Sequence, residues 1–173
     1  MKIILSGYMG SGKTAVGNEL SQVTGLRFLD LDEEISRREG RNIPEIFKTS
    51  GEIYFRKKES EVLQELINSS EDLVLSLGGG TPCYGKNLQL LQEDSEVKLI
   101  YLKTSLEELT DRLFKEMEQR PLISHLDNRE LLEDFIRKHL FERTYYYNQS
   151  DKIITTDGKT VKQVAGEILE DLN

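Results

Sequence analysis

A glycine-rich segment near the start of the chain has the composition and spacing of a phosphate-binding loop. Residues 7–14 read Gly-Tyr-Met-Gly-Ser-Gly-Lys-Thr, which matches G-x-x-x-x-G-K-[ST] and lies between an apolar run and a helical pattern. The glycines let backbone N–H groups converge on phosphate oxygens, and the start of the following helix adds a favourable dipole. Lys13 is expected to reach the β- and γ-phosphates, and the Thr14 hydroxyl to bind Mg²⁺. The segment predicts a site for ATP or GTP with Mg²⁺; the alternative is an ordinary glycine-rich turn.

The loop alone does not determine what happens to the γ-phosphate of the nucleotide. A switch GTPase needs a guanine-reading Asn-Lys-x-Asp sequence, and the chain contains none. Motors and transporters are larger or carry partner modules. A chain of 173 residues whose phosphate loop begins at residue 7 therefore favours a kinase that phosphorylates a small molecule.

Two carboxylates follow the next apolar run and are candidates for the acceptor side of such a reaction. The segment 28–32 reads Phe-Leu-Asp-Leu-Asp, which places Asp30 and Asp32 two residues apart. In a strand such side chains share a face, and parallel sheets bind ligands at the carboxyl ends of their strands. One carboxylate is suited to hold Mg²⁺ through water, and the other to orient a hydroxyl and accept its proton. The alternative is that Asp32 caps a helix over 33–39.

Glycines and arginines supply the remaining candidates. Gly78, Gly79 and Gly80 follow an apolar run at 73–77 and allow a ligand to approach backbone N–H donors, although a mobile turn is the alternative interpretation. Arginines at 56, 120 and 143 carry guanidinium groups suited to carboxylates and phosphates. Each arginine alone is typical of a surface ion pair, and sequence spacing does not show whether the three converge.

Apolar runs and helical patterns predict the elements that hold these residues. Buried strands are expected at 2–5, 27–29, 73–77, 97–102 and 152–154. Between them lie apolar residues at helical spacing, with a helix stop at Gly25 and capping boxes at Ser105 with Glu108 and at Thr160 with Gln163. Strands that alternate with helices predict a three-layer α/β domain with a mainly parallel sheet.

Composition limits the class of protein. Lys and Arg number 23 and Asp and Glu 31, so the formal net charge of −8 argues against a nucleic-acid binder, which needs a basic face. Apolar residues make up 37% of the chain without a run of membrane-spanning length. The single cysteine provides neither a disulfide nor a Cys-based metal cluster. We expect one domain over residues 1–173, in the cytoplasm, with neither a membrane nor a nucleic acid as partner.

Taken together, these segments resemble the shikimate kinase family over essentially the whole chain. The resemblance rests on the loop at 7–14, Phe-Leu-Asp-Leu-Asp at 28–32, and Gly51-Glu52 followed by Phe55-Arg56. It continues in the same order with Leu-Gly-Gly-Gly at 77–80, Arg-Pro-Leu at 120–122 and Glu142-Arg143. Many unrelated families share the phosphate loop, whereas this ordered combination is much more specific.

The resemblance implies ATP-dependent phosphorylation of the 3-hydroxyl of shikimate, a step of chorismate and aromatic amino-acid biosynthesis. It implies the P-loop kinase fold seen in nucleoside monophosphate kinases, in which helices flank a five-stranded parallel sheet of order 2-3-1-4-5. It also implies Mg²⁺ as cofactor, a monomer, a shikimate-binding region over about residues 32–60, and a mobile lid over about residues 114–127.

The resemblance further implies roles for individual residues. Asp32 would bind the acceptor hydroxyls and act as the base, while Arg56 and Arg143 would bind the shikimate carboxylate. Asp30 and Thr14 would serve Mg²⁺. The catalytic set would be Lys13, Asp32 and Arg120, the last reaching the transferred phosphate from the lid. Further shikimate contacts would come from Gly78, Gly79 and Gly80. The ATP site would consist of Gly10, Ser11, Gly12, Lys13, Thr14, Ala15, Arg112 and Arg120, with Arg112 beside the adenine.

Three segments depart from the family pattern. Thr-Pro-Cys-Tyr at 81–84 stands where a small residue and a polar turn are expected. Thr-Tyr-Tyr-Tyr at 144–147 replaces a usual Pro-Leu-Tyr, and its tyrosines are expected to pack against the core. Asp-Gly-Lys at 157–159 lies where the family contacts adenine but contains no arginine, which leaves the adenine contacts the least defined part of the site.

Two other functions compete with this interpretation. A related small-molecule kinase such as a gluconate kinase shares the loop but has a different acceptor segment after the second strand. A catalytically silent nucleotide-binding module is the alternative from another class. It has no need of the full set of candidate residues, Lys13, Asp32, Arg56, Arg120 and Arg143, all of which the chain keeps.

Overall fold

Five short parallel strands form the centre of the computed structural model, which describes residues 1–172. They pair in the order β2-β3-β1-β4-β5, as predicted. The strands are β1 (Lys2–Ser6), β2 (Arg27–Asp30), β3 (Leu73–Ser76), β4 (Val97–Lys103) and β5 (Lys152–Thr155). The bounds of each apolar run identified in the sequence therefore differ from those of the observed strand by at most one residue.

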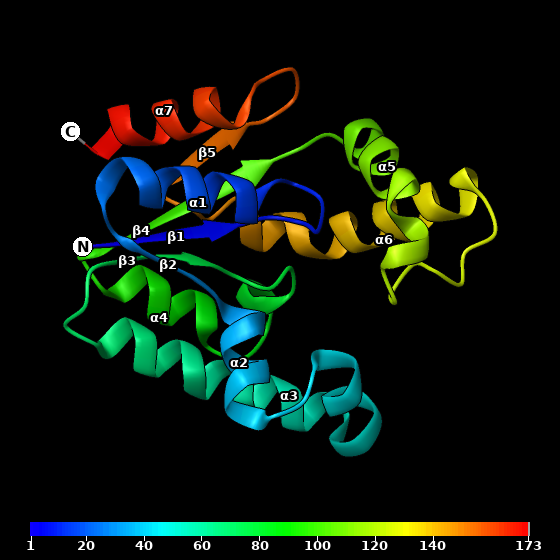
Figure 1. Cartoon of the computed structure of the whole chain (residues 1–173), viewed down its shortest axis with the longest axis horizontal. Coiled ribbons are helices and arrows are strands. Elements are labelled where there is room, and N and C mark those ends of the chain that lie inside the picture. Colours follow the sequence, from blue (N-terminus) through cyan, green and yellow to red (C-terminus); the bar gives the residue numbers. More distant parts are fainter. Residues whose placement is uncertain (173) are drawn as a thin grey trace.

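Helices cover both faces of the sheet (Figure 1). They are α1 (Lys13–Thr24), α2 (Leu31–Glu39), α3 (Ile43–Asn68), α4 (Asn87–Glu93), α5 (Leu106–Lys115), α6 (Arg129–Tyr147) and α7 (Val161–Leu172), with short 3₁₀ turns η1 (Thr81–Cys83) and η2 (Met117–Gln119). The three-layer α/β prediction is confirmed. Sequence patterns did not predict α4 or the first half of α3, which is interrupted at Gly51.

Side chains along β1 point alternately into two apolar cores, one on each face of the sheet. Ile3 and Leu5 point to the face covered by α1 and α7, whereas Ile4 points to the face covered by α2, α3 and α4. All three side chains are fully buried. The β1 strand is therefore sealed on both sides, which fixes the phosphate loop that leaves its carboxyl end.

A third apolar cluster joins the phosphate loop to an arm formed by α5, α6 and the segment between these helices. Tyr8 from the loop packs with Leu113 of α5, Ile136 of α6 and Ile123 of the segment that connects these helices. Figure 1 shows this arm extending beyond the carboxyl ends of the strands. The predicted lid, residues 114–127, comprises the end of α5, η2 and several turns. Within this segment the side chain of Ile123 is fully buried.

Local end signals of the helices follow the sequence predictions closely. Gly25 ends α1 in the left-handed conformation, with φ of 74°. Thr160 and Gln163 form a reciprocal capping box before α7. Ser105 caps α5 through the N–H of Glu108, but the box is incomplete because the N–H of Ser105 donates to Asp157. No helix among residues 1–172 has the length and apolar character needed to cross a membrane.

Close contact between α1 and β2 sets the distance between the phosphate loop and the aspartates. Gly17 on α1 faces Phe28 on β2, and a Cβ at Gly17 would lie 2.2 Å from Cε2 of the ring. Since no carbon atoms approach so closely without displacement, α1 packs at this distance only because residue 17 has no side chain.

We predict that Gly17→Ala destabilises the protein by about 1–3 kcal/mol, because overpacking outweighs the better helix propensity of alanine. Urea unfolding measures the change. Gly166→Ala on α7 is the matched control, since a Cβ there has no neighbour within 4 Å. It should be neutral or stabilising by up to about 1 kcal/mol. Equal effects of both substitutions would contradict the close packing of α1 on β2.

Candidate active site

The backbone of Gly78–Gly80, just after β3, forms the floor of the site. A Cβ on the first of these glycines would lie 3.1 Å from Oδ1 of Asp32, and one on the second 3.1 Å from Nη1 of Arg143. A Cβ on the third would lie 2.8 Å from Nη2 of Arg56. Three charged side chains from α2, α6 and α3 therefore meet on three consecutive glycines. Sequence spacing did not show this convergence.

Asp32 lies in the first turn of α2 with its carboxylate directed at the glycine floor. Its Oδ1 is buried and has no hydrogen-bond partner among the described residues. Burial above all, together with the carboxylates of Asp30 and Glu59, raises the pKa of Asp32 to about 6 against the opposing charges of Lys13 and Arg56. A buried carboxylate with a free oxygen and a raised pKa is suited to accept a proton from a hydroxyl group.

Asp30 has a structural role that sequence reasoning assigned to its neighbour. Its Oδ1 accepts hydrogen bonds from the N–H groups of Asp32 at 3.0 Å and Glu33 at 3.2 Å, so Asp30 is the N-cap of α2. The expectation that both carboxylates share a strand face was wrong, as was the alternative that Asp32 is the cap, because β2 ends at Asp30. Asp30 and Asp32 nevertheless both lie close enough to Lys13 to raise its pKa.

Glu59 holds Arg56 against the glycine floor and was not identified from the sequence. Nη1 of Arg56 donates to Oε1 of Glu59 at 2.9 Å, and the hydroxyl of Thr81 donates to Oε2 at 2.8 Å. Glu59 is fully buried, so these two partners compensate the loss of its hydration. The only local signal was a carboxylate on the otherwise apolar side of α3 that includes Val62 and Leu63. Nε of Arg56 is buried and has no hydrogen-bond partner among residues 1–172.

Arg143 lies between the phosphate loop and the second glycine of the floor. Its Cζ is 5.6 Å from the ring centroid of Tyr8. One turn further along α6, the fully buried Tyr147 donates its hydroxyl hydrogen to the carbonyl of Gly79. The expectation that tyrosines 145–147 pack against the core is confirmed for Tyr147, whereas it is wrong for Tyr145, which is 71% exposed.

The phosphate loop has the conformation that anion binding requires. Gly12 precedes α1 with φ of 95°, a left-handed value that other residues adopt only with strain. Nζ of Lys13 donates to the carbonyls of Gly7 at 2.7 Å and Tyr8 at 3.1 Å. Ser11 Oγ is buried without a hydrogen-bond partner in the described part of the chain. The loop thus places a lysine ammonium group and a buried hydroxyl at the start of α1.

Burial lowers the pKa of Lys13 to about 8. The charges of Asp30 and Asp32 oppose this effect, whereas those of Arg120 and Arg143 reinforce it. These groups act on one ammonium group and therefore occupy one region of the molecule. Asp32 and Arg120 therefore lie within the range over which their charges act on Lys13.

A second group of contacts links α5 with the phosphate loop and with the turn before α7. Arg112 on α5 donates from Nη1 to the carbonyl of Gly10 at 3.0 Å and from Nε to Glu108 at 2.9 Å. Asp157, from the turn before α7, accepts hydrogen bonds from Ser105, the N-cap residue of α5. Arg120, on the predicted lid, pairs with Glu116 at 2.6 Å.

Comparisons with known proteins identify the family. The family model for shikimate kinase matches residues 9–173. The chain is 47% identical over 169 residues to the shikimate kinase of Flavobacterium johnsoniae, which covers 98% of this chain and 97% of the relative. The chain belongs to the shikimate kinase family. Its activity is therefore that of a shikimate kinase, which phosphorylates shikimate.

Solved structures agree with this membership. The shikimate kinase of Bacteroides thetaiotaomicron superposes with a TM-score of 0.90 at 31% identity, covering 99% of this chain and 98% of the other. The Acinetobacter baumannii enzyme, solved in complex with shikimate, superposes with a TM-score of 0.86 at 35% identity and covers 99% and 92%. The fold implied by the sequence resemblance is thus confirmed.

The oxygen atoms near Lys13 fit a magnesium ion bound together with a nucleotide. Mg²⁺ prefers oxygen ligands and keeps several waters, so one or two protein groups suffice beside the phosphates. Thr14 is exposed at the start of α1, and Asp30 uses only Oδ1 for helix capping. Ser76, the register partner of Asp30 on β3, has a buried hydroxyl without a partner in residues 1–172. Within that range no group of three or more His, Cys, Asp or Glu forms a metal site of its own.

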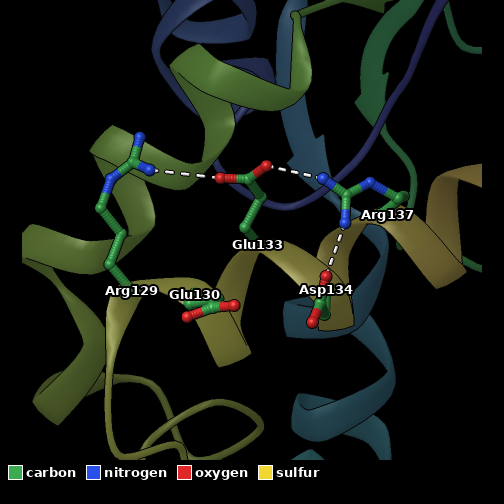
Figure 2. Close-up of a pocket in the computed structure, with 5 residues that line it drawn as sticks. All are labelled: Arg129, Glu130, Glu133, Asp134 and Arg137. Carbon is green, nitrogen blue, oxygen red and sulfur yellow. Dashed lines mark hydrogen bonds and ion pairs between the residues drawn. The ribbon is translucent and has the colours of Figure 1, made fainter.

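A surface pocket on α6 lies apart from these residues and is not used by the kinase site. Figure 2 shows its lining residues, of which Arg129, Glu133, Asp134 and Arg137 pair with one another. Glu133 joins Arg129 at 3.2 Å and Arg137 at 2.7 Å, and Arg137 also pairs with Asp134. Such exposed ion pairs contribute little to stability, and their charges are already neutralised locally.

We predict that Asp32→Asn makes this kinase more stable at pH 8, by about 1–3 kcal/mol. The pKa of Asp32 is about 6 in the folded protein and lower in the unfolded chain, so its ionised form opposes folding above pH 6. This cost fades as the pH falls from 6 to 4, and the advantage of the variant should fade with it.

Urea unfolding of both proteins between pH 4 and pH 8 measures this difference. A variant less stable than the parent at pH 8 would show instead that the cations around Asp32 stabilise its carboxylate. Equal stability at every pH would show that the carboxylate is hydrated like that of an exposed aspartate.

Proposed function

We propose that this shikimate kinase transfers the γ-phosphoryl group of ATP to the 3-hydroxyl of shikimate, using the residues grouped on the Gly78–Gly80 floor and in the phosphate loop. The observation that carries the assignment is the buried oxygen of Asp32 that has no hydrogen-bond partner among the described residues. It lies at Gly78, next to the two glycines against which Arg143 and Arg56 lie, and the charge of Lys13 acts on the same carboxylate. A carboxylate with neighbouring guanidinium groups suits an acceptor that has both hydroxyl groups and a carboxylate.

On the acceptor side, Arg56 and Arg143 bind the carboxylate of shikimate, and the backbone N–H groups of Gly78–Gly80 lie close to the bound ring. Two planar guanidinium groups fix a carboxylate in a defined direction. Asp32 then orients the 3-hydroxyl. With a pKa near 6 it is ionised at neutral pH, yet basic enough to take a proton from the hydroxyl during transfer.

On the nucleotide side, residues 10–15 surround the phosphates of ATP and Lys13 neutralises the transferring group. Lys13 exchanges its hydrogen bonds to two loop carbonyls for phosphate oxygens. Arg112, held on the carbonyl of Gly10, lies towards the adenine. Arg120 exchanges its pairing with Glu116 for the γ-phosphate when the lid segment 114–127 closes. Closure excludes water, which would otherwise compete as acceptor.

Thr14 and Asp30 serve Mg²⁺ on the bound nucleotide, with Ser76 supporting Asp30 from the neighbouring strand. When bound, the ion would supply positive charge that neutralises the phosphates of the nucleotide. The reaction needs little else from the protein than positioning and charge. The bond from the γ-phosphorus to the bridging oxygen of ADP breaks, a bond to the 3-oxygen forms, and the hydroxyl proton passes to Asp32.

We further propose that the enzyme acts as a monomer in the cytoplasm. All of the residues assigned to the reaction come from one chain, so no partner subunit is required to complete the site. ATP and shikimate are then its only partners, and both are anions that the local cations bind.

An assay of ADP release with parallel acceptors tests the function. Shikimate, gluconate and nucleoside monophosphates are offered separately with ATP and Mg²⁺. We expect turnover that depends on shikimate and background rates with the other acceptors. Turnover on gluconate or a nucleotide instead of shikimate would assign a related kinase, and none with any acceptor would leave a nucleotide-binding module.

Asp32→Asn provides the control for the acceptor side in the same assay. Loss of the base should reduce turnover with shikimate by at least about 100-fold while the protein stays folded. A near-normal rate in this variant would remove Asp32 from its proposed role, whatever the acceptor.

A further inference from the structure

An aromatic ring lies directly against the guanidinium of Arg56. The Cζ atom of Arg56 is 3.8 Å from the ring centroid of Tyr84, closer than the 5.1 Å that separates it from the ring of Phe55. At the shorter distance the planar guanidinium is in van der Waals contact with the ring face. Tyr84 belongs to the segment 81–84, where this chain departs from the family pattern.

Tyr84 connects the glycine floor with the helix that carries Arg56. It follows η1, and its hydroxyl donates to Oε1 of Glu52 at 3.2 Å. Glu52 lies one turn before Arg56 on α3, with Oε1 at 3.8 Å from the Nε of that arginine. The tyrosine therefore contacts Arg56 through its ring and the same helix through its hydroxyl.

The segment that carries Tyr84 is firmly anchored. Thr81, at the start of η1, is fully buried and donates its hydroxyl hydrogen to Glu59. Its carbonyl accepts a hydrogen bond from Nδ2 of Asn87 at 2.9 Å. Pro82 is also buried. A ring held by such a segment offers a fixed surface, although Tyr84 itself is 37% exposed.

Arg56 needs such a surface because its remaining contacts do not fix the plane of its guanidinium. The only direct hydrogen bond within the described residues is from Nη1 to Glu59, and Nε has a 3.8 Å ion-pair contact with Glu52 but no hydrogen bond. One bond at one nitrogen leaves rotation about that bond free. A carboxylate is bound by two parallel N–H···O bonds only when the guanidinium plane is correctly oriented.

We propose that Tyr84 is a positioning residue that holds the guanidinium plane of Arg56 in the orientation that binds the shikimate carboxylate. This inference rests on the proposed function of Arg56. The ring face acts through stacking, and the hydroxyl bond to Glu52 keeps the ring in register with α3. Tyr84 itself does not touch the reacting atoms.

A double-mutant cycle tests this role. Tyr84→Leu removes the ring, and Tyr84→Phe is the matched control that keeps the ring but not the hydroxyl. We expect Tyr84→Leu to raise the KM for shikimate by about 5- to 20-fold and to leave the KM for ATP within about twofold. Tyr84→Phe should stay within about threefold of the parent for both substrates.

The second side of the cycle distinguishes positioning from a general structural effect. In an Arg56→Ala background, Tyr84→Leu should cause no further rise in the KM for shikimate, because the group it orients is gone. With the carboxamide analogue of shikimate as acceptor, the parent and Tyr84→Leu should differ little, because the neutral amide cannot form the bidentate ion pair.

The proposal is overturned if Tyr84→Leu leaves the KM for shikimate unchanged, raises the KM for ATP equally, or has its full effect in the Arg56→Ala background. Should Tyr84→Leu unfold, Tyr84→Met replaces it in the cycle with the same criteria. A parent enzyme without shikimate turnover would overturn the proposed function and this role together. If the parent turns over shikimate normally and Tyr84→Leu has the same KM for shikimate as the parent, only the positioning role is overturned.

Discussion

Three consecutive residues without side chains allow the charged groups of this kinase to meet. Asp32, Arg56 and Arg143 come from three different helices, and each lies within about van der Waals distance of one glycine in Gly78–Gly80. A Cβ at Gly80 would lie 2.8 Å from Nη2 of Arg56 and displace this guanidinium, whereas at Gly78 or Gly79 it would lie 3.1 Å from a charged atom and crowd it. Two further contacts support this arrangement. The α1 helix packs closely on β2 at Gly17, and Glu59 accepts a hydrogen bond from Arg56.

Local charge, and not net charge, explains how the enzyme would hold two anionic ligands. The formal charge of −8 repels anions weakly at distance, but salt screens such fields within roughly 8 Å at physiological ionic strength. Inside the site, Lys13, Arg56, Arg120 and Arg143 concentrate positive charge around two aspartates. Because these cations also shift the pKa values of Lys13 and Asp32, binding and proton transfer in the proposed mechanism depend on the same few residues.

Much of the fold could be predicted from the sequence, since apolar runs and helix caps are local signals. The prediction that Asp30 and Asp32 share a strand face failed because β2 ends at Asp30; only a strand that continued two residues further, to Asp32, would turn both side chains to one face. The packing of Tyr147 against the core could be predicted, but the partners of Glu59, Tyr84 and Tyr147 could not. Their contacts join Glu59 to Thr81, Tyr84 to Glu52 and Tyr147 to Gly79, and no periodicity along the chain reports which distant residues meet.

Binding of shikimate to Gly80→Ala, measured by calorimetry, tests the central role of the glycine floor most directly. The added methyl group would lie 2.8 Å from Nη2 of Arg56, which can swing away without disturbing the fold. We expect shikimate affinity to fall by at least about 10-fold, with nucleotide affinity and thermal stability retained. Unchanged shikimate affinity in a folded Gly80→Ala variant would contradict the account.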